Sequence, residues 1–92
     1  MTTQIDREAV AIGRAVHGAV TAAGLSLAEA AEQSAIPLTT FSRRVNGRLP
    51  FTFPELVRVA RISGVSVTEL ATSAERILQS NAGPASEDRV PA

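Results

Sequence analysis

Apolar residues recur every three or four positions along most of the chain, which is the spacing of one face of an α-helix. The first such stretch runs from Ile5 to Ala23, and the same spacing returns in four later stretches. No stretch alternates apolar and polar residues as a half-buried strand would. The pattern therefore predicts an all-α fold with five helices, at residues 6–23, 27–34, 38–45, 53–63 and 67–80.

Three of these helices begin with a serine or threonine followed three residues later by a glutamate. In this capping box, each of the two side chains accepts a hydrogen bond from the other residue's amide. The three pairs are Ser26 with Glu29, Thr52 with Glu55, and Ser66 with Glu69. Glycines, at Gly24 and Gly64, follow two of the helices, where a left-handed residue commonly ends a helix.

The length of 92 residues predicts one small domain. We expect residues 1–80 to fold and residues 81–92, which include two prolines and one glycine, to form a disordered tail. The sequence has no cysteine, so packing alone must stabilise the domain, without a disulfide or a thiolate metal site. It also has no signal-like leader and no long apolar run, from which we expect a cytoplasmic protein outside the membrane.

The second and third helices are short and are joined only by Ala35, Ile36 and Pro37. A connection of this length is typical of a helix-turn-helix unit. Small residues at Ala31 and Ala35 would let the two helix backbones approach each other closely. We therefore expect residues 27–45 to form a helix-turn-helix.

Charge is distributed unevenly along the chain. The formal net charge is zero, yet residues 43–61 contain five arginines and one acid, a local balance of +4. A polyanion responds to the charge on the surface that it meets rather than to the sum over the molecule. The local excess is compatible with a nucleic-acid partner despite the neutral total.

Over about residues 10–80, the chain resembles the Cro/repressor type of helix-turn-helix domain. The resemblance is carried by residues 25–36, which read LSLAEAAEQSAI, by TTFSR at 39–43 with Asn46 and Gly47, and by later positions that include Gly64 and Leu70. It implies a five-helix, lambda-repressor-like domain that binds double-stranded DNA through the helix at 38–45. Two departures concern that surface: Ala35 stands where the family usually has glycine, and Leu27 stands where it often has glutamine.

Helical periodicity orients the helix at 38–45. A helix advances about 100° per residue, so Phe41 and Val45 share one side while Thr39 and Arg43 point to the other. Together with the resemblance, this predicts base-reading roles for Leu38, Thr39, Ser42 and Arg43. Phosphate contacts are predicted for Ser26, Thr40, Arg44, Asn46, Gly47 and Arg48, with the backbone donors of Asn46 and Gly47 facing the strand. The alternative is that Arg43 and Arg44 simply form a solvated helix face.

The sequence contains no recognisable catalytic set, phosphate-binding loop or metal-ligand cluster. The single histidine, His17, has no second ligand at a suitable spacing. We therefore expect no enzyme activity, cofactor, metal or small-molecule ligand. The predicted function is sequence-specific transcription regulation by operator occupancy, as in a phage or prophage Cro-like protein or small repressor. The alternative is a protein-interaction module, such as an antitoxin or an adaptor, on the same fold.

The last helix has an apolar stripe that extends to its C-terminal end. If the first helix does not cover this end, two copies could pair there and bind a palindromic operator as a homodimer. The predicted dimer interface comprises Ala74, Ile77 and Leu78. The alternative is a monomer in which the first helix reaches far enough to bury these side chains.

Overall fold

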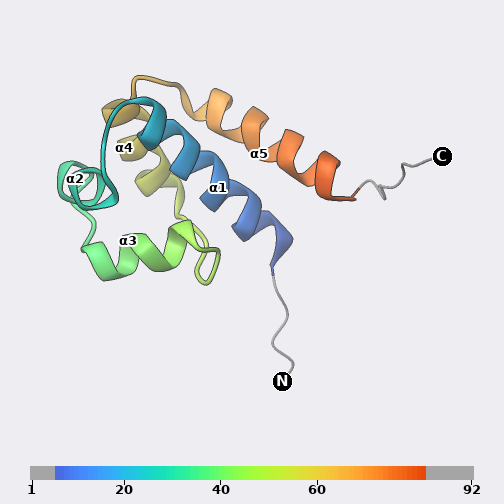
Figure 1. Ribbon diagram of the computed structural model, residues 1–92, viewed down its shortest axis with the longest axis horizontal. Helices are drawn as coiled ribbons and strands as arrows, with labels where there is room; N and C mark the ends of the chain where they lie inside the picture. Colours follow the sequence, from blue (N-terminus) through green and yellow to red (C-terminus); the bar gives the residue numbers. More distant parts are fainter. Residues whose placement is uncertain (1–5, 83–92) are drawn as a thin grey trace.

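The computed structural model describes residues 6–82, and this part of the chain is entirely helical apart from its turns. The helices are α1 (Arg7–Ala22), α2 (Leu27–Gln33), α3 (Leu38–Val45), α4 (Phe53–Ser63) and α5 (Val67–Ala82) (Figure 1). The predicted all-α, five-helix fold is confirmed, with helix ends within two residues of their expected positions. The disordered tail was predicted for residues 81–92, of which 83–92 lie outside the described residues.

The three predicted capping boxes are present. In α4, for example, Oε1 of Glu55 accepts from the amide of Thr52 at 2.8 Å, and Oγ1 of Thr52 accepts from the amide of Glu55 at 3.3 Å. The boxes of α2 and α5 have the same reciprocal bonds. The carboxylate of Asp6 caps α1, and the bonds from the amide of Ala9 and from Glu8 lower the pKa of Asp6. Only α3 begins without a side-chain cap, after Pro37.

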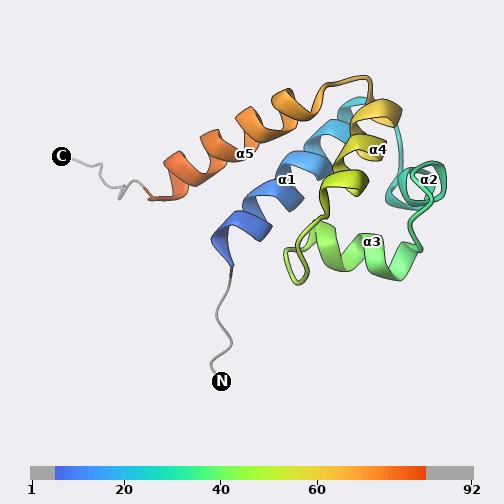
Figure 2. The ribbon, with the colours of Figure 1, turned by 180° about the vertical axis from the view of Figure 1, so that it is seen from behind.

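Helix α1 lies at the centre of the fold and contacts each of the other four helices. Figures 1 and 2 show α5 running beside α1 in the opposite direction, with α2 and α3 on the other side of α1. The main core gathers side chains from all five helices, and its fully buried large residues are Val16, Val20, Phe41, Val59 and Leu70. Phe41 and Phe51 meet edge to face, with ring centroids 5.9 Å apart.

A second, smaller cluster fills the seam between α1 and α5. Ala74 is only 8% exposed because it packs against Ala11 and Ala15, and Ile77 and Leu78 are half-buried against the same helix. The expectation that Ala74 is available to a second copy is therefore wrong. Helix α1 reaches the C-terminal part of α5, as the monomer alternative required, although Ile77 and Leu78 remain partly exposed.

The backbone of α1 also comes close to the backbone at the end of α3. A Cβ atom on Gly13 would lie 2.8 Å from the carbonyl oxygen of Arg44 and closer still to that of Val45. Gly47 has φ +82°, and a Cβ there would lie 2.9 Å from Cα of Val10. These two glycines set how closely α3 docks on α1.

Within the described residues, no single helix is long and apolar enough to cross a membrane. Helices α1 and α2 together have the length and hydropathy of a membrane span, but their axes are bent by 97° relative to each other.

Candidate nucleic-acid interface

The turn between α2 and α3 is anchored by the buried residues on either side of Ala35. Ser34 is completely buried, and its Oγ donates to the carbonyl of Ala30 at 2.6 Å. Ala35 adopts φ +61°, the left-handed conformation that glycine takes without a Cβ penalty. Ile36 then enters the core at 4% exposure. Helices α2 and α3 thus form the expected helix-turn-helix, with backbone strain stored at Ala35.

Arg58 of α4 reinforces this turn through a contact that was not predicted from the sequence. Its Nε donates to the carbonyl of Ser34 at 2.8 Å, across 24 residues of sequence. A cation at the C-terminal end of α2 also complements the helix dipole. The bond depends on how α4 packs, so no local pattern could have identified it.

A shallow groove of about 610 Å³ lies between the first turn of α2 and the outer face of α3. It contains the four side chains that were predicted to read bases, together with Asn46 and Arg48 from the end of α3. The lining residues are Leu27, Ala28, Leu38, Thr39, Ser42, Arg43, Asn46 and Arg48. Ala28 was not anticipated, since it carries no chemistry that a sequence pattern would select.

The groove residues have the exposure that periodicity predicted for them. Phe41 and Val45 are buried, whereas Thr39 and Arg43 are exposed on the opposite side of α3. Leu38 is 49% exposed, which is unusual for a large apolar side chain in a helix. The groove therefore combines polar donors and two arginines with the apolar side chains of Leu27, Ala28 and Leu38, and none of its lining residues is acidic.

Arg44 faces away from the groove and is engaged within the protein. Its Nε lies 3.2 Å from Oε1 of Glu55, and its Nη1 donates to the carbonyl of Pro50. The Nε–H is buried and is not aligned for a hydrogen bond, so charge attraction dominates the contact. The expectation that Arg44 binds phosphate is not supported, because this contact already occupies its side chain in joining α3 to α4.

The backbone at the end of α3 corrects a second expectation. The amides of Asn46, Gly47 and Arg48 donate to the carbonyls of Ser42, Arg44 and Arg43, respectively, at 2.9–3.1 Å. They close the helix, so none of them is available to a DNA strand. The side chains of Asn46 and Arg48 are exposed and remain able to donate.

The other two predicted phosphate ligands lie outside the groove lining. The hydroxyl oxygen of Ser26 accepts from the amide of Glu29 at 3.1 Å, which leaves its own O–H free to donate. Thr40 is half-buried on α3. The residues that the structure describes contain no cluster of histidine and acidic side chains suited to a metal ion.

Comparison with known proteins gives two matches. A family model described as a helix-turn-helix domain matches residues 11–73, more than half of the chain. Among solved structures, the chain is similar to the clp gene regulator ClgR from Corynebacterium glutamicum, with 23% sequence identity, a TM-score of 0.81 and coverage of 88% of this chain and 86% of that chain. At this identity, the similarity shows a shared fold. A search of curated proteins found no significant match.

Proposed function

The chain belongs to the helix-turn-helix domain family, and on that premise we propose that it is a sequence-specific, double-stranded DNA-binding regulator of transcription. The groove beside α3 carries the proposal, because it gathers Thr39, Ser42 and Arg43 on one exposed, acid-free surface. A helix that presents such a surface fits the major groove of B-DNA, where base edges are distinguishable. Similarity to a clp gene regulator adds support at the level of the fold.

Base reading falls to four side chains of α3. The fork of Arg43 suits O6 and N7 of a guanine, and the hydroxyls of Thr39 and Ser42 suit donors or acceptors on a neighbouring pair. Leu38 is exposed at the start of α3, where its side chain would contact a thymine methyl. Arg43 contributes most to discrimination, because a bidentate contact to one base is the most selective of these.

Phosphate contacts fall to side chains around the rim of the groove. Arg48 and Asn46 lie at the C-terminal end of α3, and the hydroxyl of Ser26 lies at the start of α2. The first amides of α3 add backbone donors, because no side chain caps that helix. We leave Arg44 and the backbone amides of Asn46 and Gly47 out of this set, since all have partners within the protein.

We further propose that two copies pair across the outer side of α1 and α5, through the partly exposed Ile77 and Leu78. A groove of about 510 Å³ between these helices is lined by the half-buried Ile77, by Arg14 and Arg76, and by Glu69. Antiparallel pairing would bring the arginines of one copy toward Glu69 of the other. Such a dimer would place two α3 helices about one DNA turn apart, on a palindromic operator.

A Cro-like protein or small repressor of a phage or prophage fits this proposal, since operator occupancy needs no further chemistry. The second candidate is a protein-interaction module, such as an antitoxin or adaptor. It is favoured by the zero net charge and by the exposed side chain of Phe53. In that case, affinity for any duplex would be weak and equal across sequences.

DNA binding to fragments from the neighbourhood of the gene, measured at several salt concentrations, tests the proposal. We expect one fragment to bind at least about 10³-fold more tightly than random duplex of equal length. Equal affinity for all fragments would refute sequence-specific binding. Sedimentation of the wild type, Ile77→Asp and Arg76→Glu tests pairing separately, and a mass that stays monomeric on the operator would contradict the dimer.

A further inference from the structure

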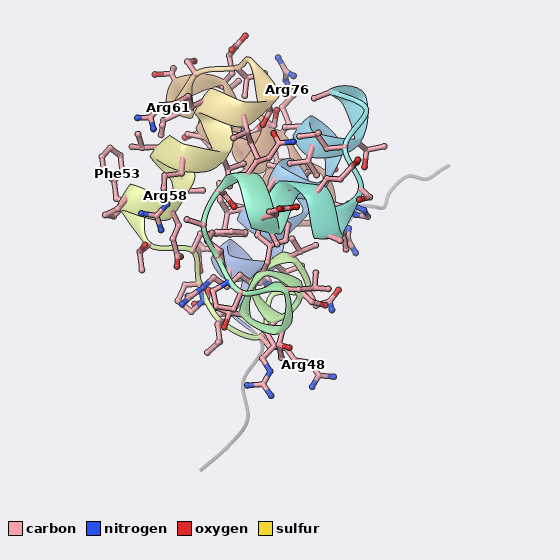
Figure 3. The ribbon with its side chains drawn as sticks, turned by 90° about the vertical axis from the view of Figure 1, so that its left-hand side faces the viewer. Arg48, Phe53, Arg58, Arg61 and Arg76 are labelled. Carbon is pink, nitrogen blue, oxygen red and sulfur yellow. The ribbon has the colours of Figure 1, made fainter. Side chains whose placement is uncertain are left out.

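The outer face of α4 presents an apolar and basic stripe to solvent. Phe53, Val57 and Arg61 follow one another at intervals of four residues, so they lie on one side of the helix, and Arg58 flanks them. Figure 3 shows Phe53, Arg58 and Arg61 projecting from α4 on one side of the molecule, with Arg48 at a separate place. We call these four residues, Phe53, Val57, Arg58 and Arg61, the α4 face.

Phe53, the largest apolar member of the α4 face, lies outside both core clusters. Phe53 is 66% exposed, the highest exposure among the large apolar side chains described. The cap of α4 is made by Thr52 and Glu55, and Phe51 is the aromatic residue that enters the core. Val57 is half-buried and belongs to neither core cluster. Phe53 therefore leaves a large aromatic surface in solvent beside the edge of Val57, which a contact with a partner would bury.

The basic members are arranged to hold carboxylates. The Nε of Arg58 is fixed by the carbonyl of Ser34, so its terminal amino groups are presented with little remaining freedom. Arg61 has no ion-pair partner among the described residues. A preorganised guanidinium binds a carboxylate with less loss of entropy than a free one. The α4 face carries no acid of its own, so its charge complements an acidic partner.

From these observations, we propose that the α4 face is a docking surface for a segment of another protein that presents apolar side chains next to carboxylates. Duplex DNA fits it less well, because a phosphate backbone offers nothing to Phe53 and Val57. No residue of α4 lines the groove beside α3. The two surfaces are separate, so the protein would bind this partner and DNA at the same time.

The test is a titration of the full chain, without DNA, by two synthetic helical peptides of equal length. Both carry leucines at three- and four-residue spacing, and the polar face is glutamate in one and lysine in the other. We expect the glutamate peptide to shift backbone amide resonances of residues 53–61 saturably and the lysine peptide to leave them unchanged. The absence of DNA separates this result from the proposed DNA-binding function.

Variants then assign the contact to the α4 face. Phe53→Ser and Arg61→Gln should each weaken binding of the glutamate peptide at least about fivefold. Arg7→Gln, which removes an exposed arginine from α1, is the matched control. It should change the affinity for the glutamate peptide by less than about twofold. Arg58 is unsuitable as a test position because its bond to Ser34 supports the turn.

Four outcomes of the peptide titrations and mass measurements would overturn the inference. They are equal binding of both peptides, the absence of saturable binding, amide shifts confined to α3, and a mass change on Phe53→Ser that identifies a second copy as the occupant. A loss of DNA affinity in Arg61→Gln as large as that in Arg48→Ala would assign the α4 face to the DNA backbone and overturn it equally.

Discussion

The guanidinium of Arg44 and the carboxylate of Glu55 form the ion pair that joins α3 to α4, with Nε 3.2 Å from Oε1. The same carboxylate oxygen closes the capping box of α4 by accepting from the amide of Thr52. Both side chains are largely shielded from solvent. Glu55 thus determines both where α4 begins and how α3 is held against it.

Replacement of Glu55 should therefore cost more than replacement of an ordinary capping glutamate. We expect Glu55→Ala to lower the free energy of unfolding by about 2 to 3 kcal/mol, because it removes a cap and leaves a shielded arginine unpaired. Glu29→Ala removes the equivalent cap from α2 without an ion pair and should cost about 1 kcal/mol. Urea denaturation measures both, and equal losses would mean that the ion pair contributes nothing.

Arg43→Ala should weaken binding to the preferred operator by about 1 to 3 kcal/mol and relax the preference at one base pair. The reason is the loss of a bidentate contact to guanine. Competition binding with operators substituted at each position measures both effects. An equal loss of affinity for operator and random duplex would show that Arg43 does not read a base.

Arg48→Ala should weaken binding to all duplexes alike, because a phosphate contact carries no sequence information. The slope of log affinity against log salt concentration should become shallower by about one unit. Arg44→Ala is the matched control in the same segment. Because the side chain of Arg44 pairs with Glu55, this substitution should lower the free energy of unfolding and leave the salt slope unchanged. A shallower slope for Arg44→Ala would show that Arg44 contacts a phosphate after all.

Ala35→Gly should stabilise the domain by about 0.5 to 1 kcal/mol. Alanine at φ +61° carries a steric penalty that glycine lacks, and this exceeds the entropy that glycine gains in the unfolded chain. Ala23→Gly is the control, because Ala23 also follows a helix but has φ −81°. Thermal melting compares the two variants. An unchanged melting temperature for Ala35→Gly would mean that Ala35 carries no net strain in the native turn.

The two glycines inside α1 should respond in opposite ways to alanine. Gly13→Ala would place a Cβ against the carbonyls of Arg44 and Val45, so it should destabilise the protein by about 1 to 3 kcal/mol. Apart from the local backbone of α1 itself, no atom lies within 4 Å of the Cβ position of Gly18, so Gly18→Ala should stabilise the protein by about 0.5 to 1 kcal/mol. Unfolding at low protein concentration keeps self-association out of the comparison. A gain at position 13 would contradict the close approach of α1 and α3.

The sequence by itself determined the elements of this protein and the orientation of α3. Caps such as Ser26 with Glu29 act over three residues, and the placement of Phe41 inside and Arg43 outside follows from one helical period. Such features depend on neighbours along the chain, so a local pattern specifies them. The surface that would face DNA was predictable for the same reason.

Tertiary structure alone decided which of these groups already had partners. Arg43 and Arg44 are adjacent and chemically identical, yet only Arg44 lies opposite Glu55 once α3 and α4 have both packed against α1. The bond from Arg58 to Ser34 and the burial of Ala74 by α1 have the same origin. Each depends on the angle and distance between helices that are far apart in sequence, which are set by packing of the whole core rather than by any local run of residues.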